Sequence, residues 1–225
     1  ILLKHNMIDL RRYHAFCLGF DLVDEEMGCD FYPDEYKDLN LFSEFICIHP
    51  SQTWESRTWE KNKWDALLRM LLEAGKKIVI VGKSQEHFEP GEEWNKPKPV
   101  FTLDVPEEYS DNVLDLTDKA DLSQTWHIID KSLCLVTMDT GLLHLAGTTD
   151  SEIIQLGSSI NYKFRAPYRN GRQDYKHKYI GGPCNIACAS DLKYALKVHG
   201  DIQSMPPLWK CLEVADRDPR ADDFK

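Results

Sequence analysis

The short motif Asp139-Thr140-Gly141, with His144 three positions further on, combines residue types that suit a diphosphate. It follows the apolar residues 133–137 (LCLVT), which are predicted to form a buried strand. Gly141 allows a sharp turn, and the first turn of a following helix presents N–H groups that bind anions. Thr140 offers a hydroxyl and an amide there, and His144 adds a donor. The alternative is that Asp139 merely caps the helix and His144 is a satisfied surface residue.

Two other interpretations of short motifs are disfavoured by their context. Asp-Thr-Gly is also the signature of aspartic proteases, but that site needs a second copy or a homodimer and a motif in a β loop. Here the apolar residues 142–146 continue the motif as a helix. Gly82-Lys83-Ser84 resembles the end of a phosphate-binding P-loop, but Lys77 stands where that loop requires its first glycine.

A second group of candidate residues lies at the end of the predicted strand 45–49 (FICIH), in the segment 49–59 (HPSQTWESRTW), which begins with His49. Arg57 supplies a planar guanidinium suited to phosphate or sugar oxygens. Trp54 and Trp59 could stack on the face of a sugar, or they could simply pack at the start of the next helix.

These motifs lie at the ends of predicted strands that alternate with helices. Apolar runs predict strands at 45–49, 77–82, 113–116, 133–137 and 152–156, and periodic stretches predict helices at 61–74, 121–132 and 141–146. Residues 83–99 are predicted to form a loop or irregular insertion, residues 158–179 an Arg/Tyr-rich loop, and residues 191–198 a helix. The fold class is therefore predicted to be α/β, with a Rossmann-like open parallel sheet.

Local signals define two of these helices. Trp64, Leu67, Leu68, Leu71 and Leu72 follow the spacing of one buried helix face, and Gly75 supplies a stop. Asp121 and Gln124 have the spacing of a capping box, and Leu122, Trp126 and Ile129 are predicted to form the buried stripe of the helix that follows.

Composition excludes several classes of function. The 225 residues carry a formal net charge of -10, which disfavours a nucleic-acid partner. No apolar run approaches the roughly 20 residues of a transmembrane helix, so the chain is predicted to be cytoplasmic, with peripheral membrane contact left open. Seven cysteines, an odd number, do not predict a disulfide framework.

Two longer stretches carry a resemblance to a known family. IHPSQTWESRTWEKNKWDALL and VTMDTGLLHLAGTTDSEIIQLGS resemble the C-terminal, donor-binding domain of glycosyltransferase family 9, the bacterial heptosyltransferases. In that family a strand is followed by Asp-Thr-Gly, two residues, His, an apolar helix and a strand ending in Gly. The resemblance covers about residues 40–160 and implies the C-terminal half of a GT-B glycosyltransferase.

The resemblance also implies a nucleotide-sugar site. Its residues would be Ser51, Gln52, Arg57, Glu86, Lys119, Ala120, Asp139, Thr140, Gly141 and His144. The backbone near residues 119 and 120 would meet the base, Glu86 the ribose, and the other residues the diphosphate and donor sugar.

The implied reaction is inverting transfer of a sugar from a nucleotide diphosphate sugar, ADP-heptose, to a glycan or lipopolysaccharide-type acceptor. Arg57 and His144 would stabilise the leaving group without a required metal cofactor. The family's N-terminal domain supplies the acceptor site and the base, so residues 1–40 are expected to be a connector or a remnant of that domain. Residues 41–200 would form the nucleotide-sugar-binding domain, and residues 201–225 a tail. The alternatives are a nucleotide-sugar-binding module without turnover, or another GT-B transferase or epimerase.

Three C-terminal cysteines suggest a separate structural site. Cys184, Cys188 and Cys211, with His199 as fourth ligand, form a set that zinc or iron accepts. Some autotransporter heptosyltransferases related to the family hold a metal with C-terminal cysteines. The alternative is three reduced thiols that pack the end of the chain.

Overall fold

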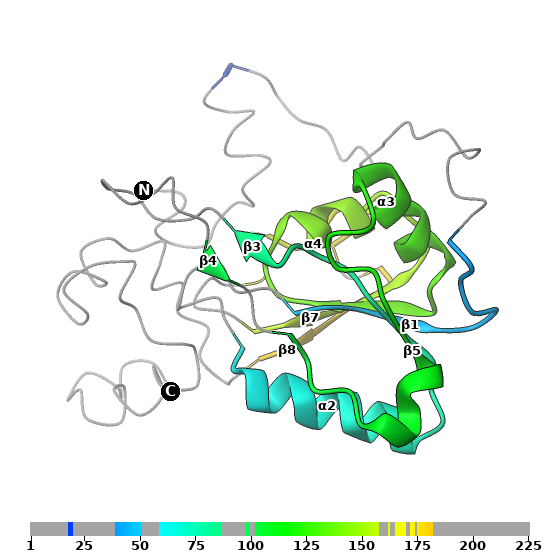
Figure 1. Cartoon of the computed structure of the whole chain (residues 1–225). Coiled ribbons are helices and arrows are strands. Elements are labelled where there is room, and N and C mark those ends of the chain that lie inside the picture. Colours follow the sequence, from blue (N-terminus) through cyan, green and yellow to red (C-terminus); the bar gives the residue numbers. More distant parts are fainter. Residues whose placement is uncertain are drawn as a thin grey trace, which may run out of the picture.

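The computed structural model describes residues 18–19, 39–50, 59–86, 98–99, 102–157, 162, 165–169, 172–173 and 175–181. These ranges contain an open sheet with helices on both faces, which is drawn in colour in Figure 1.

The main sheet has six strands, and every pairing within it is parallel. The strands are β1 (Ile46–His49), β2 (Ile78–Ile80), β5 (Val113–Asp115), β6 (Cys134–Thr137), β7 (Glu152–Leu156) and β8 (His177–Ile180). Their order across the sheet is β5-β2-β1-β6-β7-β8. The chain therefore runs outward from β1 to β5, returns to the centre, and runs outward again from β6 to β8. This is the doubly wound arrangement, and it confirms the predicted Rossmann-like open parallel sheet.

Helices cover both faces of this sheet (Figure 1). Helix α2 (Lys61–Glu73) lies on one face, and α3 (Leu122–Lys131) and α4 (Gly141–Ala146) lie on the other. A 3₁₀ helix, η3 (Glu107–Asn112), leads into β5. A separate two-residue antiparallel ladder joins β3 (Gln85–Glu86) to β4 (Lys98–Pro99).

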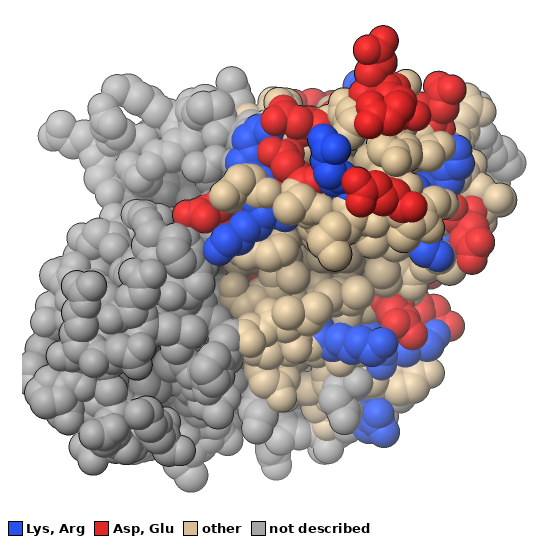
Figure 2. Space-filling model, turned by 90° about the horizontal axis from the view of Figure 1, so that it is seen from below, with Lys and Arg blue, Asp and Glu red and all other residues tan. Residues whose placement is uncertain are grey.

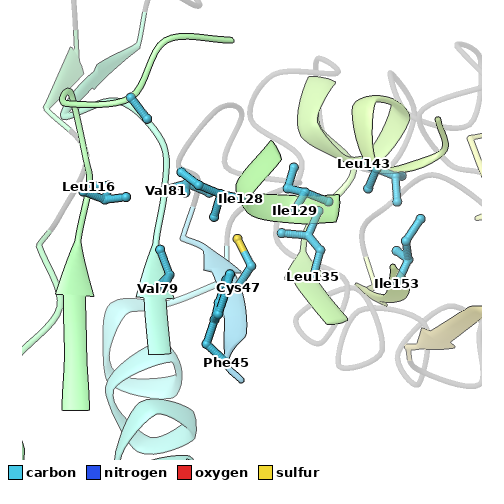
Figure 3. Packing of buried hydrophobic residues seen from close by; sticks show 12 residues of the cluster. Phe45, Cys47, Val79, Val81, Leu116, Ile128, Ile129, Leu135, Leu143 and Ile153 are labelled. Atoms are coloured by element: carbon cyan, nitrogen blue, oxygen red, sulfur yellow. The ribbon is translucent and has the colours of Figure 1, made fainter. Parts of the chain in front are cut away.

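Successive side chains of each strand lie on opposite faces of the sheet, so they join two different hydrophobic cores. Phe45 and Cys47 of the central segment pack toward α3 and α4, together with Val79, Leu135 and Ile153. Figure 3 shows this cluster, with Cys47 and Phe45 between the β2 side and the residues of α3 and α4. On the opposite face, the alternate strand residues pack on the buried side of α2, formed by Trp64, Leu68 and Leu72.

The local signals at the ends of α2 and α3 are confirmed. The Asp121 carboxylate accepts from the Gln124 amide, and the Gln124 side chain accepts from the Asp121 amide, which completes the capping box. At the end of α2, Gly75 has a φ of 73°, and its N–H donates to the carbonyl of Leu72. The N–H of Lys76 donates to the carbonyl of Leu71, so this end is a Schellman motif.

Three predictions about elements are corrected by the structure. Strand β8 falls in the Arg/Tyr-rich stretch that was predicted to be loop. Leu122 is 61% exposed rather than part of a buried stripe, because α3 buries Thr125, Ile128 and Ile129 instead. The two ends of the predicted insertion 83–99 pair with each other as β3 and β4. The predicted helix 191–198 and the tail lie outside the described residues.

Surface charge on the described part of the chain is mixed. On the α2 side, Figure 2 shows lysines and arginines interspersed with aspartates and glutamates. None of the helices in the described ranges combines the length and apolarity needed to cross a bilayer.

Candidate donor-binding site

The candidate site lies at the carboxyl ends of β1 and β6, where the strand order reverses. In open α/β sheets ligands collect at this switch point, because the connections from the two strands diverge to opposite faces. His49 ends β1, Thr137 ends β6, and the two residues are register partners. The predicted motif begins two residues after Thr137, so the fold brings it to the switch point.

A buried polar group joins the two strand ends. His49 Nδ1 lies 3.0 Å from Thr137 Oγ1 and 3.3 Å from Thr140 Oγ1, and the two hydroxyls are 3.3 Å apart. His49 is 5% exposed and Thr137 is 0% exposed. Burial lowers the pKa of His49 to about 4, so the imidazole is neutral at pH 7 and has one N–H and one acceptor nitrogen.

Gly82, which follows β2, leaves room for this imidazole. A Cβ at position 82 would lie 3.0 Å from His49 Cδ2 and 3.3 Å from Nε2, closer than ordinary contact. Gly82 also has a φ of 136°, which disfavours any side chain. The histidine ring is therefore confined between the backbone of Gly82 and the two threonine hydroxyls.

The start of α4 does not match the simple capping alternative. The N-cap residue is Thr140, not Asp139, and Thr140 makes no side-chain capping bond. Its hydroxyl lies near His49 and Thr137 instead. His144, the fourth residue of α4, is half-buried.

Asp139 is buried at the end of β6 and faces an arginine from a distant segment. It is 2% exposed, and its Oδ2 lies 3.8 Å from Nε of Arg165. Because Arg165 is 25% exposed, the cation lies at the rim of the site rather than in the core. This pair places one negative and one positive group beside the β6–α4 turn.

Arg169 holds the other end of α4. Its guanidinium is 6% exposed and donates to three carbonyls: Gly147 at 3.2 Å, Ser151 at 2.7 Å, and Ala146. Helix α4 is only six residues long, and its last carbonyls have no intrahelical partner. The Ala146 carbonyl also accepts from Thr149, and Arg169 adds a charged donor at this end of the helix. Arg169 thereby ties the segment that carries Arg165 to α4.

An open cleft lies next to Gly82, at the carboxyl ends of β1, β2 and β5. It is lined by Pro50, Ile80, Val81, Gly82, Lys83, Ser84, Thr102, Leu103, Asp115 and Thr117. Asp118 closes the loop beside it, because its carboxylate accepts from the Ser84 amide at 3.2 Å and its own N–H donates to the carbonyl of Gly82. Hydrogen bonds from Ser84 lower the pKa of Asp118.

The structure places some of the predicted site residues together. Asp139 and Thr140 form the turn between β6 and α4 at the switch point, and Gly141 and His144 lie in the first turn of α4. Lys119 and Ala120 follow β5, near the cleft, but the N–H groups of both donate to the carbonyl of Leu116. A base could meet other backbone groups there, but not these two donors.

The remaining predicted residues cannot be placed in the same way. Glu86 is the second residue of β3, and its side chain lies outside the described part. Ser51, Gln52, Arg57 and Trp54 also lie outside the described residues, as do Cys184, Cys188, His199 and Cys211. Trp59 packs edge-on against Trp64 at 5.3 Å, which supports the packing alternative for that tryptophan.

Arg165 and Arg169 were not assigned to the site from the sequence, and His49 was included only in the group at the end of the first predicted strand, without a role of its own. His49 ends an apolar strand before a proline, and that position was the available signal for it. The two arginines are separated from their partners by about 20 residues or more, which leaves no local pattern to detect.

We predict that Arg169→Met lowers the free energy of unfolding by about 3 kcal/mol, because carbonyls at the end of α4 lose a charged donor in a buried place. Arg169→Lys should retain part of this stability, since an ammonium reaches fewer of the three carbonyls. Urea unfolding followed by circular dichroism measures the change. Arg172→Met is the matched control, because Arg172 is exposed. Equal stability of Arg169→Met and the control would contradict the role assigned to Arg169.

Comparisons with known proteins agree with this architecture. Several solved structures share the fold. The iron-containing dodecameric glycosyltransferase TibC from enterotoxigenic E. coli H10407 is 16% identical, with a TM-score of 0.56 over 84% of this chain and 43% of that chain. Its complex with ADP-D-beta-D-heptose is similar at 15% identity, with a TM-score of 0.55 and the same coverage of 84% and 43%. A family 9 glycosyltransferase from Veillonella parvula DSM 2008 is 12% identical, with a TM-score of 0.50 over 79% of this chain and 47% of that chain.

The chain spans only part of such proteins, between 38% and 54% of the E. coli heptosyltransferases that it also matches. A search among curated proteins finds no match. The sequence profile of glycosyltransferase family 9 (heptosyltransferase) matches residues 19–184, which is most of the chain. The chain therefore belongs to glycosyltransferase family 9, and its open parallel sheet is the C-terminal half of a GT-B fold.

Proposed function

We propose that this chain binds the donor of an inverting glycosyltransferase that moves a sugar from a nucleotide diphosphate sugar, ADP-heptose, to a glycan or lipopolysaccharide-type acceptor. The observation that carries the proposal is the position of the Asp139-Thr140-Gly141 turn at the switch point, beside the open cleft at the ends of β1, β2 and β5. Family membership and the ADP-D-beta-D-heptose complex of TibC support this class of donor.

The ends of four neighbouring strands form a row that is long enough for an elongated ligand. The cleft covers the ends of β5, β2 and β1, and the Asp139 turn follows the next strand, β6. Neighbouring strands are about 4.8 Å apart, so this row spans about 14 Å. In this proposal the nucleoside occupies the cleft and the diphosphate and sugar lie over β1 and β6.

The chemistry proposed for the β6–α4 turn is stabilisation of the leaving diphosphate. Helix α4 has six residues, so its contribution comes from local N–H groups rather than from a large macrodipole. His144 adds a donor from the same turn, and Arg57, assigned by resemblance alone, adds a cation. Donors held in place before the reaction lower the barrier because they need not reorganise as charge develops. Arg165 offsets the negative charge of Asp139, which would otherwise repel the phosphates.

Isothermal titration calorimetry of the chain with ADP, UDP and GDP tests the proposal. ADP is expected to bind without added metal, and more tightly than AMP, because the second phosphate reaches the β6–α4 turn. A folded protein that binds none of the three, or that binds them only after metal is added, would contradict the proposed site.

His144→Ala is predicted to weaken ADP binding by about 1 to 3 kcal/mol, the range for a lost hydrogen bond to a charged group. The free energy of unfolding should stay nearly unchanged, because the half-buried side chain leaves little apolar contact behind. Calorimetry and urea unfolding of the same sample separate the two effects. His127→Ala on α3 is the control for loss of a histidine. Reduced stability with unchanged ADP affinity would support a packing role.

Arg165→Gln is predicted to weaken ADP about tenfold and AMP less, because the carboxylate of Asp139 would lose its cation partner near the second phosphate. Arg172→Gln changes the net charge equally, and it serves as the control for nonspecific attraction. Affinities for both nucleotides are compared across the variants. An equal loss for ADP and AMP would place Arg165 away from the second phosphate.

A further inference from the structure

We propose that His49 is a positioning residue of the donor site, and that it acts by holding the hydroxyl of Thr140 away from the helix it would otherwise cap. The inference rests on the proposed function, since it concerns how Thr140 meets the diphosphate of the donor. His49 itself has no assigned contact with the donor.

The first step of the argument is the behaviour of Thr140. A threonine at the N-cap ordinarily accepts a hydrogen bond from an amide of the first turn, which is worth about 1 kcal/mol. Thr140 occupies the N-cap of α4 and makes no such bond. Its hydroxyl lies 3.3 Å from His49 Nδ1 and 3.3 Å from Thr137 Oγ1. The contact with His49, 91 positions away in the sequence, thus takes the place of the capping hydrogen bond that a threonine usually makes here.

The second step is that His49 is rigidly placed. The imidazole is buried, Thr137 Oγ1 lies 3.0 Å from the same Nδ1, and Gly82 bounds the opposite side of the ring. A buried polar group in such a place keeps its partners, because an unsatisfied partner would cost the free energy of desolvation. The ring therefore defines where both threonine hydroxyls lie.

The third step concerns the consequence for the donor. While the Thr140 hydroxyl is held by Nδ1, it does not compete with an anion for the amides of the α4 first turn. Without Nδ1, rotation about the Thr140 side chain lets the hydroxyl cap the helix. His49 thus keeps the turn in the arrangement that accepts a diphosphate.

Two amide substitutions separate this role from simple packing. Nδ1 is bonded to Cγ, and asparagine carries its amide on that carbon, whereas glutamine carries it one carbon further, near the position of Nε2. We expect His49→Asn to bind ADP within about threefold of the wild-type chain, and His49→Gln to bind about tenfold more weakly. A packing role predicts the reverse order, because glutamine fills the histidine volume better and leaves the smaller cavity.

A double-mutant cycle identifies the residue through which His49 acts. Thr140→Ala removes the competing hydroxyl, so His49→Gln should weaken ADP no further in that background. Independent effects would instead multiply. Thr148→Ala, which alters a hydroxyl elsewhere in the α4 region, is the control background, and there the tenfold loss should persist.

The outcomes are distinguishable. No ADP binding by the folded wild-type chain overturns the proposed function and this inference with it. Wild-type binding together with equal affinities for His49→Asn and His49→Gln, or with independent effects in the cycle, overturns the inference alone. Near-wild-type affinity of His49→Asn and a tenfold loss for His49→Gln, with that loss abolished by Thr140→Ala, support it.

Discussion

Strand β1 is the constraint on which the arrangement of the site depends. It pairs with β2 on one side and with β6 on the other. The chain continues from β1 through β2 to β5 at one edge of the sheet, and then returns to β6, beside β1. The connections that follow β1 and β6 cover opposite faces, so the two strand ends form a crevice between them. The strand interiors are apolar, whereas the last register pair is the polar pair His49 and Thr137. In β1 and β6, polar side chains are thus confined to the carboxyl ends of the strands.

Helix α4 depends on its surroundings for its conformation. A helix of six residues is too short to be stable alone, because nucleation is unfavourable and few hydrogen bonds follow it. Its buried residues, Leu143 and Ala146, join the core that contains Ile153. Arg169 adds a charged donor to carbonyls at its end. Tertiary contacts therefore set the geometry of the turn that precedes it, and this makes distant residues relevant to the binding of a donor.

The part of this molecule that could be predicted from the sequence is the part that local physics determines. The bounds of α4 and β7, the Gly75 stop and the capping box at Asp121 all follow from residues within one or two turns. The Asp139 turn was predicted for the same reason. Strand β8 was missed, because its residues His177, Lys178, Tyr179 and Ile180 mix charge with apolar groups, as an edge strand allows.

The contacts that complete the site could not be predicted, because they join residues far apart in the chain. His49 and Thr137 are 88 positions apart, and they become neighbours only through the parallel pairing of β1 with β6. Arg169 meets Ala146 across 23 positions. An apolar pattern can indicate that a strand is buried, but it carries no information on which strand lies beside it.

Strand β8, which was not predicted from the sequence, helps to position a residue of the candidate site. It pairs with β7, and its His177 ring bonds the Gln155 side chain at 2.9 Å. Tyr162, which precedes Arg165 and Arg169 in the sequence, stacks on Tyr179 of β8 with the ring centroids 4.5 Å apart. Tyr162 before residues 165–169 therefore contacts the strand that follows them, and Arg169 attaches these residues to α4. An edge strand with little apolar character thus contributes to the site by fixing where Arg165 lies beside Asp139.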